Sequence, residues 1–246
     1  MLKGTVSFRA EIKGNGLTFP RVAWNPKEPG VDRVELEGPN GDEILSSVHL
    51  ESVATEDEGK AIAARVNTAA LDRISFFHGL ATENEKITGV QFSPVDPQPG
   101  VLEASAGSLV ITGWAPKLVL GIPAATVQGE LEGAAPPGEA NFGLFRSALQ
   151  SASPVEAFMH MYHILMMLFG DRQSDVDAFV TSEDPTVPQT QHPLKYPGVM
   201  ETIYTRLRNE LAHKRAGVNL QDTKLGMANR LGGLVAVTKR AIELYS

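Results

Sequence analysis

The sequence predicts an α+β protein, in which a mainly antiparallel β domain with one helix is followed by an all-helical bundle. Three observations lead to this fold class. Apolar and polar residues alternate over much of residues 1–125, as in half-buried strands, whereas residues 140–246 repeat their apolar positions at helical spacing. A segment rich in Gly, Ala and Pro lies between these parts, at 129–139. We therefore expect two domains, 1–128 and 140–246, joined by this linker.

Strand patterns dominate the N-terminal domain. Residues 5–12 alternate between apolar and polar, and residues 17–24 follow them after an Asn-Gly turn, which is a strong hairpin signal. One helix interrupts the strands, because residues 55–58 (Thr-Glu-Asp-Glu) form a capping box and apolar residues then recur at helical spacing up to Phe77. Further strands are expected at 34–36, 44–50, 86–92, 108–114 and 117–122, with a long loop at 93–107.

Helix signals follow one another in the C-terminal domain. One helix begins with an N-cap serine, Ser153, a proline at its first position and a glutamate at its third, and Gly170 stands where a C-cap glycine belongs. A segment with four prolines, 181–197, is expected to be a loop. The remaining helices are expected at 142–150, 174–180, 200–211 and 221–244.

Composition excludes several kinds of site and compartment. The chain has no cysteine, which rules out disulfides, iron–sulfur clusters and cysteine-ligated zinc. The N-terminus lacks the apolar run of a signal peptide. The most apolar stretch, 155–169, is shorter than the roughly 20 residues needed to span a bilayer. We therefore expect a soluble, cytoplasmic protein that does not enter a membrane.

Charge is unevenly distributed along the chain. The formal net charge is −7, and residues 1–150 account for all of it. Residues 206–240, in contrast, contain eight basic and two acidic side chains, a net charge of +6. A local basic surface on an acidic protein favours an anionic ligand at that place, although two solvated surface helices would show the same pattern.

Residues 208–213, which read RNELAH, combine side chains suited to chemistry on a phosphodiester. Asn209 and His213 lie four residues apart on one helix face, so the amide can orient the imidazole. Arg208 lies about 140° from His213 around the helix axis, and both can reach one groove. Histidine can exchange a proton with an RNA 2′-hydroxyl or a 5′-oxygen, and arginine can bind phosphate without a metal ion. Alternatively, both side chains cap the helix C-terminus.

The segment YTRLRNELAHKR, at residues 204–215, resembles the Arg-Asn-x-x-x-His motif of the HEPN superfamily (higher eukaryotes and prokaryotes nucleotide-binding). An apolar helix precedes the motif and one long helix follows it, and the resemblance covers residues 140–246. It implies a four-helix domain that is a metal-independent endoribonuclease without a cofactor, in a toxin–antitoxin or anti-phage defence system. It also implies a homodimer in which two motifs line one RNA-binding cleft, and an antitoxin or activator protein is a further expected partner.

The resemblance assigns roles residue by residue. Arg208 and His213 are expected to be the catalytic pair, and Asn209 is expected to orient the histidine. The cations expected to hold the RNA backbone are Arg206, Lys214 and Arg215.

Other polar clusters are weaker candidates. Glu156 and His160 lie four residues apart on the apolar helix and are expected to line the same cleft as Arg208. His160 and His163 have a spacing that metal ligands use, but no third ligand is evident, so no metal site is expected. Three aspartates that follow this helix are expected to be caps and solvated surface: Asp171, Asp175 and Asp177.

Two alternatives keep the same fold without RNA cleavage. The helical domain could be a catalytically inactive HEPN-like module that binds a nucleotide or RNA or mediates dimerisation in a regulatory role. It could also be a structural partner of another protein, with the motif only capping a helix. The N-terminal domain resembles no family known to us, and we expect it to be an accessory or sensor domain.

Overall fold

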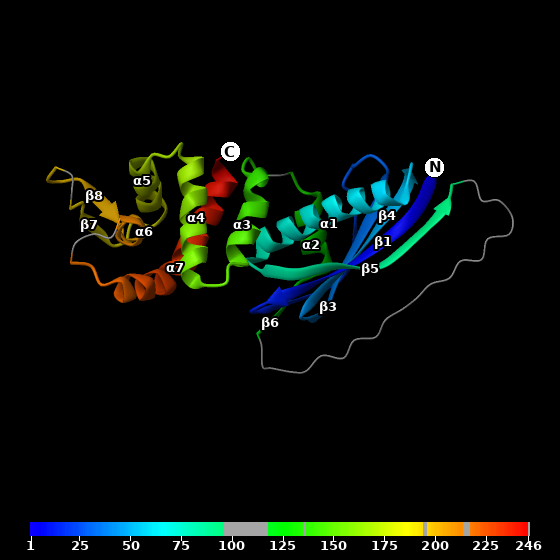
Figure 1. Cartoon of the computed structure of the whole chain (residues 1–246), viewed down its shortest axis with the longest axis horizontal. Helices are drawn as coiled ribbons and strands as arrows, with labels where there is room; N and C mark the ends of the chain where they lie inside the picture. Colours follow the sequence, from blue (N-terminus) through cyan, green and yellow to red (C-terminus); the bar gives the residue numbers. More distant parts are fainter. Residues whose placement is uncertain (96–117, 135, 194–195, 214–216, 246) are drawn as a thin grey trace. The chain divides into compact units, whose positions relative to one another are not determined.

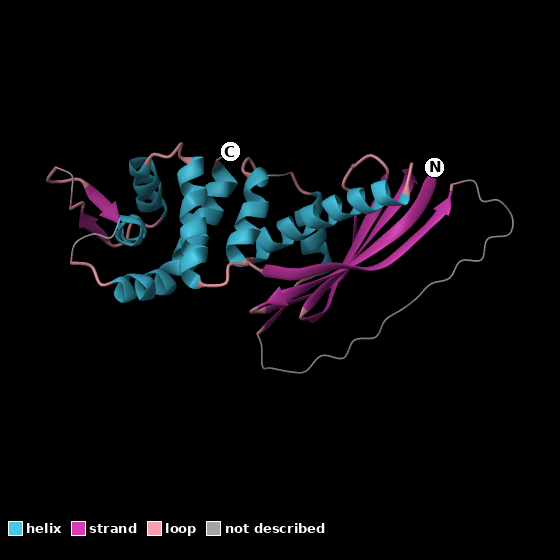
Figure 2. Ribbon diagram, in the orientation of Figure 1, coloured by secondary structure: helices cyan, strands magenta, loops and turns pink. Residues whose placement is uncertain are grey.

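A computed structural model of the chain describes residues 1–95, 118–134, 136–193, 196–213 and 217–245. The chain forms two compact units, Met1–Ala134 and Ala135–Ser246. The first is built around a β-sheet and the second around helices (Figure 1, Figure 2). The protein is therefore a mixed α+β protein, and each unit is described by itself.

The first unit contains a six-stranded sheet in the order β5-β1-β4-β3-β2-β6. Its neighbouring strands are antiparallel, except that β2 and β6 run parallel. In β1, Val6, Phe8 and Ala10 are buried, whereas Thr5 and Ser7 point to the opposite, polar face, as a side-chain period of two requires. The strands are β1 (Leu2–Lys13), β2 (Gly16–Trp24), β3 (Val31–Gly41), β4 (Glu43–Val53), β5 (Ala81–Pro94) and β6 (Val119–Gly121).

Two helices, α1 (Glu56–His78) and α2 (Ala124–Glu132), cover the apolar face of this sheet (Figure 1). α1 begins at the predicted capping box, where Thr55 Oγ1 accepts a hydrogen bond from the Glu58 amide at 3.1 Å. It ends at Gly79, whose φ of 64° is a left-handed conformation that favours glycine. The helix residues that enter the core of the sheet are Ala63, Val66, Ala70, Leu71, Ile74, Val127 and Leu131.

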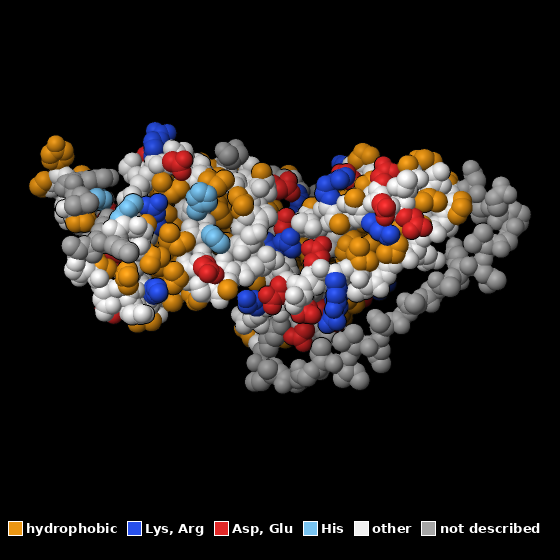
Figure 3. Space-filling view, viewed as in Figure 1, with side chains coloured by type: hydrophobic (Ala, Val, Ile, Leu, Met, Phe, Trp, Pro, Cys, Tyr) orange, Lys and Arg blue, Asp and Glu red, His pale blue; other side chains and the backbone are white. Residues whose placement is uncertain are grey.

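The surface of the first unit mixes charges of both signs. On the face drawn in Figure 3, acidic and basic side chains of this unit are interspersed. Some of them pair between elements, such as His78 of α1, whose Nε2 lies 2.8 Å from Glu130 Oε2 of α2. This face has the pattern of a solvated surface rather than of a polyanion-binding patch.

The described part of the second unit consists of helices and one short ladder of strands. α4 packs against α3 and α7, and α6 packs against α7. Its elements are a 3₁₀ turn (Glu139–Asn141), α3 (Phe142–Leu149), α4 (Pro154–Leu168), α5 (Gln173–Glu183), β7 (Gln189–Gln191), β8 (Met200–Thr202), α6 (Ile203–His213) and α7 (Leu220–Leu244). Its large buried side chains include Phe142, Phe145, Phe158, Met161 and Tyr162.

The ladder is the main difference from the fold predicted for the second unit. Residues 189–191, predicted to lie in a loop, form β7 and pair antiparallel with β8. β8 takes up 200–202, where the apolar spacing predicts a helix, so α6 begins only at Ile203. The pairing itself explains the difference, because Gln189, Thr190 and Gln191 lie opposite Thr202, Glu201 and Met200, and a pairing between two segments is not visible in the apolar spacing of one. The described part of this unit is therefore not purely α-helical.

Smaller differences concern the segment between the units. α2 extends to Glu132, so helix continues into the predicted linker 129–139, because its apolar residues pack on the sheet. The strand predicted at 117–122 is reduced to β6. The strand predicted at 108–114 and most of the loop predicted at 93–107 lie outside the described residues. No helix in the described parts of the chain is long and apolar enough to cross a membrane.

Two adjacent glycines of α7 should respond oppositely to alanine. A Cβ at Gly232 would meet nothing within 4 Å, so Gly232→Ala should raise the free energy of unfolding by about 0.5–1 kcal/mol through helix propensity. A Cβ at Gly233 would lie 2.3 Å from the hydroxyl of Tyr204, which is buried, so Gly233→Ala should lower it by about 1–3 kcal/mol. Urea unfolding measures both values. A stabilising Gly233→Ala would contradict the packing of Tyr204 on α7.

Candidate functional site

The polar residues of the RNELAH segment lie on the last turns of α6. This helix buries Ile203, Tyr204 and Leu207 within the unit. Arg208, in contrast, is partly exposed, and His213, the last residue of the helix, is exposed. The helix therefore presents an arginine and a histidine to solvent at its C-terminal end.

The side chains of Arg208 and His213 lie next to each other. Arg208 Nη1 is 3.5 Å from His213 Nε2, and it donates a hydrogen bond to Asn209 Oδ1 at 2.9 Å. The imidazole can accept from the guanidinium only in the tautomer whose proton is on Nδ1. Within the described residues, neither Arg208 nor His213 bonds a helix carbonyl. Their contacts in this part of the chain are therefore not those of helix caps.

Asn209 holds Arg208 rather than His213. Its side chain is 3% exposed, and its Nδ2 lies 3.3 Å from Glu201 Oε2 and 3.4 Å from Gln173 Oε1. A buried amide needs acceptors for its hydrogens, and a guanidinium is a stronger donor to its oxygen than an imidazole four residues away. The predicted role of Asn209 is therefore corrected: in the described structure it orients the arginine.

Two ionisable residues beside Asn209 come from the segment before α6. Glu201 of β8 is 1% exposed, and its Oε2 lies 3.8 Å from Nε2 of His192, which is also buried. A carboxylate is costly to bury unless polar partners compensate it, and Asn209 and His192 are two such partners. Sequence analysis missed both residues, because it placed His192 in a loop and had no indication of which way Glu201 points.

Arg208 also lies over the ring of Tyr162, on α4. The Arg208 Cζ atom is 5.9 Å from the ring centroid, within the range of a cation–π contact. The Tyr162 ring is 2% exposed, and its hydroxyl lies 2.7 Å from Thr205 Oγ1. Burial raises the pKa of Tyr162 well above its usual value, so the hydroxyl stays protonated at neutral pH.

Asp177 of α5 contacts Thr205, the hydrogen-bond partner of Tyr162. Its Oδ1 accepts hydrogen bonds from the Thr202 amide at 3.0 Å, from Thr202 Oγ1 at 2.6 Å and from Thr205 Oγ1 at 2.6 Å. Burial raises the pKa of this carboxyl, and the hydrogen bonds oppose the rise. The prediction that Asp177 is solvated surface is therefore wrong, because its partners lie 25 and 28 residues further along the chain.

Glu156 and His160 do not lie beside Arg208 in the described contacts. Both are exposed; Glu156 lies in the first turn of α4, and His160 Nδ1 is 3.1 Å from Ser151 Oγ. Tyr162, which does contact Arg208, is two residues after His160 and therefore about 200° around the helix from it. The expectation that Glu156 and His160 line the cleft is corrected in favour of Tyr162.

The three cations expected to hold RNA do not share one described surface. Lys214 and Arg215 lie outside the described residues. Arg206 is two residues before Arg208, which turns it about 200° around α6. Its Nε lies 3.4 Å from Glu210 Oε1. Arg206 therefore faces away from Arg208, although it lies two turns before His213 and within about 20° of it around the helix axis.

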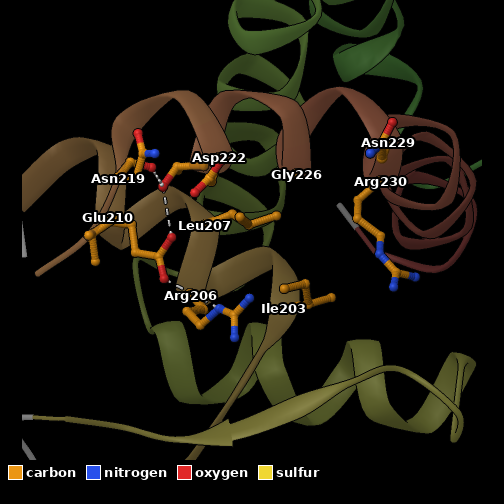
Figure 4. A pocket seen from close by; sticks show the side chains of 11 residues that line it. Ile203, Arg206, Leu207, Glu210, Asn219, Asp222, Gly226, Asn229 and Arg230 are labelled. Atoms are coloured by element: carbon orange, nitrogen blue, oxygen red, sulfur yellow. Dashed lines mark hydrogen bonds and ion pairs between the residues drawn. The ribbon is translucent and has the colours of Figure 1, made fainter.

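Arg206 instead lines a groove of about 530 Å³ between α6 and α7 (Figure 4). Arg206 and Arg230 lie on either side of Ile203 in this view, and Leu207 adds a second apolar wall. A Cβ at Gly226 would come within 2.9 Å of Leu207 Cδ2, so the glycine is what lets the two helices approach here. The other lining residues are Glu210, Val218, Asn219, Asp222, Thr223 and Asn229.

Two further observations concern metal ligands among the described residues and similarity to known proteins. In the described ranges, no group of three or more His, Asp or Glu side chains could hold a metal ion. Comparison of the chain with family models, with curated proteins and with solved structures found no match. The RNELAH segment and the contacts around α6 are therefore the observations that bear on function.

Proposed function

We propose that the C-terminal unit is a metal-independent endoribonuclease of the HEPN type. The observation that carries the proposal is the 3.5 Å approach of Arg208 Nη1 to His213 Nε2 at the exposed end of α6. A fixed cation beside an imidazole is the pair of groups that phosphodiester cleavage by proton transfer needs. The resemblance of residues 204–215 to the Arg-Asn-x-x-x-His motif supports the same activity.

In the proposed reaction, an RNA 2′-oxygen attacks the adjacent phosphorus, and the bond from phosphorus to the 5′-oxygen breaks. The products are a 2′,3′-cyclic phosphate and a free 5′-hydroxyl. His213 Nε2 takes the proton of the attacking hydroxyl, or the protonated ring gives one to the leaving oxygen. Arg208 donates to the non-bridging phosphate oxygens, where negative charge builds up in the transition state.

Asn209 contributes by orienting Arg208. A guanidinium carries five N–H groups. Among the described residues, the contacts to Asn209 and His213 both use Nη1, so Nη2 and Nε are the groups proposed to meet phosphate oxygens. Glu201 and Gln173 accept the amide hydrogens of Asn209, which keeps the amide oxygen turned toward Arg208.

A homodimer is the proposed setting of the reaction. One chain presents a single Arg208–His213 pair, whereas cleavage by proton transfer works best with an acid and a base on opposite sides of the phosphate. Two copies of α6 that face one cleft would provide both. We place this dimer in the cytoplasm, in a toxin–antitoxin or anti-phage system with an antitoxin or activator protein, and the N-terminal unit would be its accessory or sensor part.

A second candidate function, nucleotide or RNA binding without cleavage, is favoured by the groove between α6 and α7. Its volume of about 530 Å³ lies in the range of small-molecule sites. Arg206 and Arg230 offer guanidinium groups to a phosphate, and Ile203 and Leu207 offer apolar walls to a base or sugar. In this case the chain would be an inactive HEPN-like module with a regulatory role.

Wild-type protein should cleave mixed single-stranded RNA in the presence of EDTA. His213→Ala should lower the rate by about 10²–10⁴-fold, the usual contribution of general acid–base catalysis. Arg208→Gln should lower it by about 10²–10³-fold, because transition-state charge loses its donor. Arg206→Gln removes a cation that faces away from Arg208 and pairs with Glu210, so it should have a much smaller effect. Fragments of labelled RNA on gels measure the rates. Equal inertness of wild type and His213→Ala at high protein concentration would exclude the nuclease.

The dimer can be tested by mass and by mixing variants. Light scattering should give a mass near twice the 26.4 kDa of the chain. An excess of His213→Ala chains added to the wild type should lower the cleavage rate per wild-type chain, because a mixed dimer holds one histidine where the reaction uses an acid and a base. A monomeric mass at all concentrations, with no loss of rate on mixing, would contradict the composite site.

The binding function predicts that the groove takes up a mononucleotide. Calorimetry with AMP should detect binding to the wild type, and Arg206→Gln and Arg230→Gln should each weaken it by about tenfold or more, the loss of one charge-assisted contact. Arg240→Gln is the matched control on α7, because Arg240 pairs with Glu183 and Glu243 outside the groove. Binding that all three variants leave unchanged would place the nucleotide elsewhere.

A further inference from the structure

The guanidinium of Arg208 is held from two directions. Asn209 accepts a hydrogen bond from Nη1, and the ring of Tyr162 lies 5.9 Å from Cζ. An arginine side chain has several rotatable bonds, and it loses the benefit of its planar fork unless neighbouring groups fix its orientation. The ring of Tyr162 can therefore orient Arg208 only if the ring itself is held in place.

The hydroxyl of Tyr162 is fixed by a hydrogen-bond chain with a defined direction. Thr205 Oγ1 donates its single proton to Asp177 Oδ1 at 2.6 Å. Thr205 can then only accept at its 2.7 Å contact with Tyr162, so Tyr162 must be the donor. The order is thus Tyr162 O–H to Thr205 O–H to Asp177, and the carboxylate end determines where the phenol proton points.

Asp177 is anchored more firmly than a surface carboxylate. Besides Thr205, it accepts from both the amide and the hydroxyl of Thr202, at the junction of β8 and α6. Its own helix is α5, while Tyr162 belongs to α4. These hydrogen bonds therefore connect α4, α5, α6 and β8 next to Arg208.

We propose that Tyr162, Thr205 and Asp177 are positioning residues for Arg208, which keep its guanidinium beside His213 so that it meets a phosphate in a fixed orientation. The catalytic consequence rests on the proposed nuclease function, whereas the orientation itself does not. None of the three residues contacts the reacting atoms. Their effect passes through the face of the Tyr162 ring and through the hydroxyl chain that holds the ring in place.

The orientation can be measured without any activity. The proton NMR signal of Arg208 Nε–H, resolved in a proton–nitrogen correlation spectrum and identified by its loss in Arg208→Lys, should be displaced from the position of a solvated arginine by the ring current of Tyr162. Tyr162→Leu should move it to the solvated position, whereas Tyr162→Phe and Thr205→Val, which keep the ring and break the same hydroxyl contact, should each reduce the displacement in part. Asp175→Asn is the matched control on α5, because Asp175 pairs with Arg172 at 3.2 Å on the surface.

Kinetics provide the second measurement. Tyr162→Leu should lower kcat for RNA by about tenfold with little change in KM, because a misdirected guanidinium costs most in the transition state. Tyr162→Phe should restore kcat to within about threefold of the wild type. Thr205→Val, which keeps the ring but breaks its hydroxyl contact, should lower kcat by a smaller factor than Tyr162→Leu, and circular dichroism shows whether each variant is folded.

The two hypotheses fail in different ways. A wild type that does not cleave RNA would reject the nuclease, and the NMR signal would still decide whether Arg208 is positioned. An Arg208 signal at the solvated position in the wild type, or one that Tyr162→Leu and Thr205→Val leave unchanged, would overturn the positioning proposal. Equal kcat in folded wild type and Tyr162→Leu would overturn its catalytic part.

Discussion

One carboxylate oxygen, Oδ1 of the half-buried Asp177, is the hydrogen-bond acceptor on which the arrangement around α6 depends. It accepts hydrogen bonds from Thr202 and Thr205, on either side of the point where β8 becomes α6. Without it, a backbone N–H and two hydroxyls would lose their acceptor in a buried place, at about 1–3 kcal/mol for each group. The start of α6, and with it the position of Arg208, therefore depends on a carboxylate that belongs to another helix.

Elements with local signals could be predicted from the sequence, and the elements without them could not. The capping box at Thr55 and the apolar spacing that follows it predict α1 almost to its observed ends, and α7 agrees equally well. The β7–β8 ladder escaped prediction because its strands have three residues each. Such strands are too short to show alternation, and only their pairing with each other defines them.

The same distinction applies within the candidate site. The spacing of Arg208 and His213, about 140° apart around one helix, predicted that both side chains can reach one groove, and the structure adds that Nη1 and Nε2 approach to 3.5 Å. The partner of Asn209 could not be predicted, because Glu201 comes from the ladder. Tyr162 lies on a helix whose orientation toward α6 is set by packing, 43 residues before its hydrogen-bond partner Thr205. Neighbours within one helix can be predicted from the sequence, whereas contacts that depend on tertiary packing cannot.

The contacts of Arg208 also separate the two explanations of the RNELAH segment. A helix cap needs only that a cation reach the last carbonyls, and it leaves the rest of the side chain free. Arg208 is instead constrained by an amide on one side and an aromatic ring on the other, while His213 beside it is exposed. Ordering a long side chain in this way opposes its conformational entropy and gains nothing for capping. It is useful where a ligand must meet a guanidinium in one orientation, as a phosphate does. The buried network beneath α6 therefore favours a site for an anion over a structural cap.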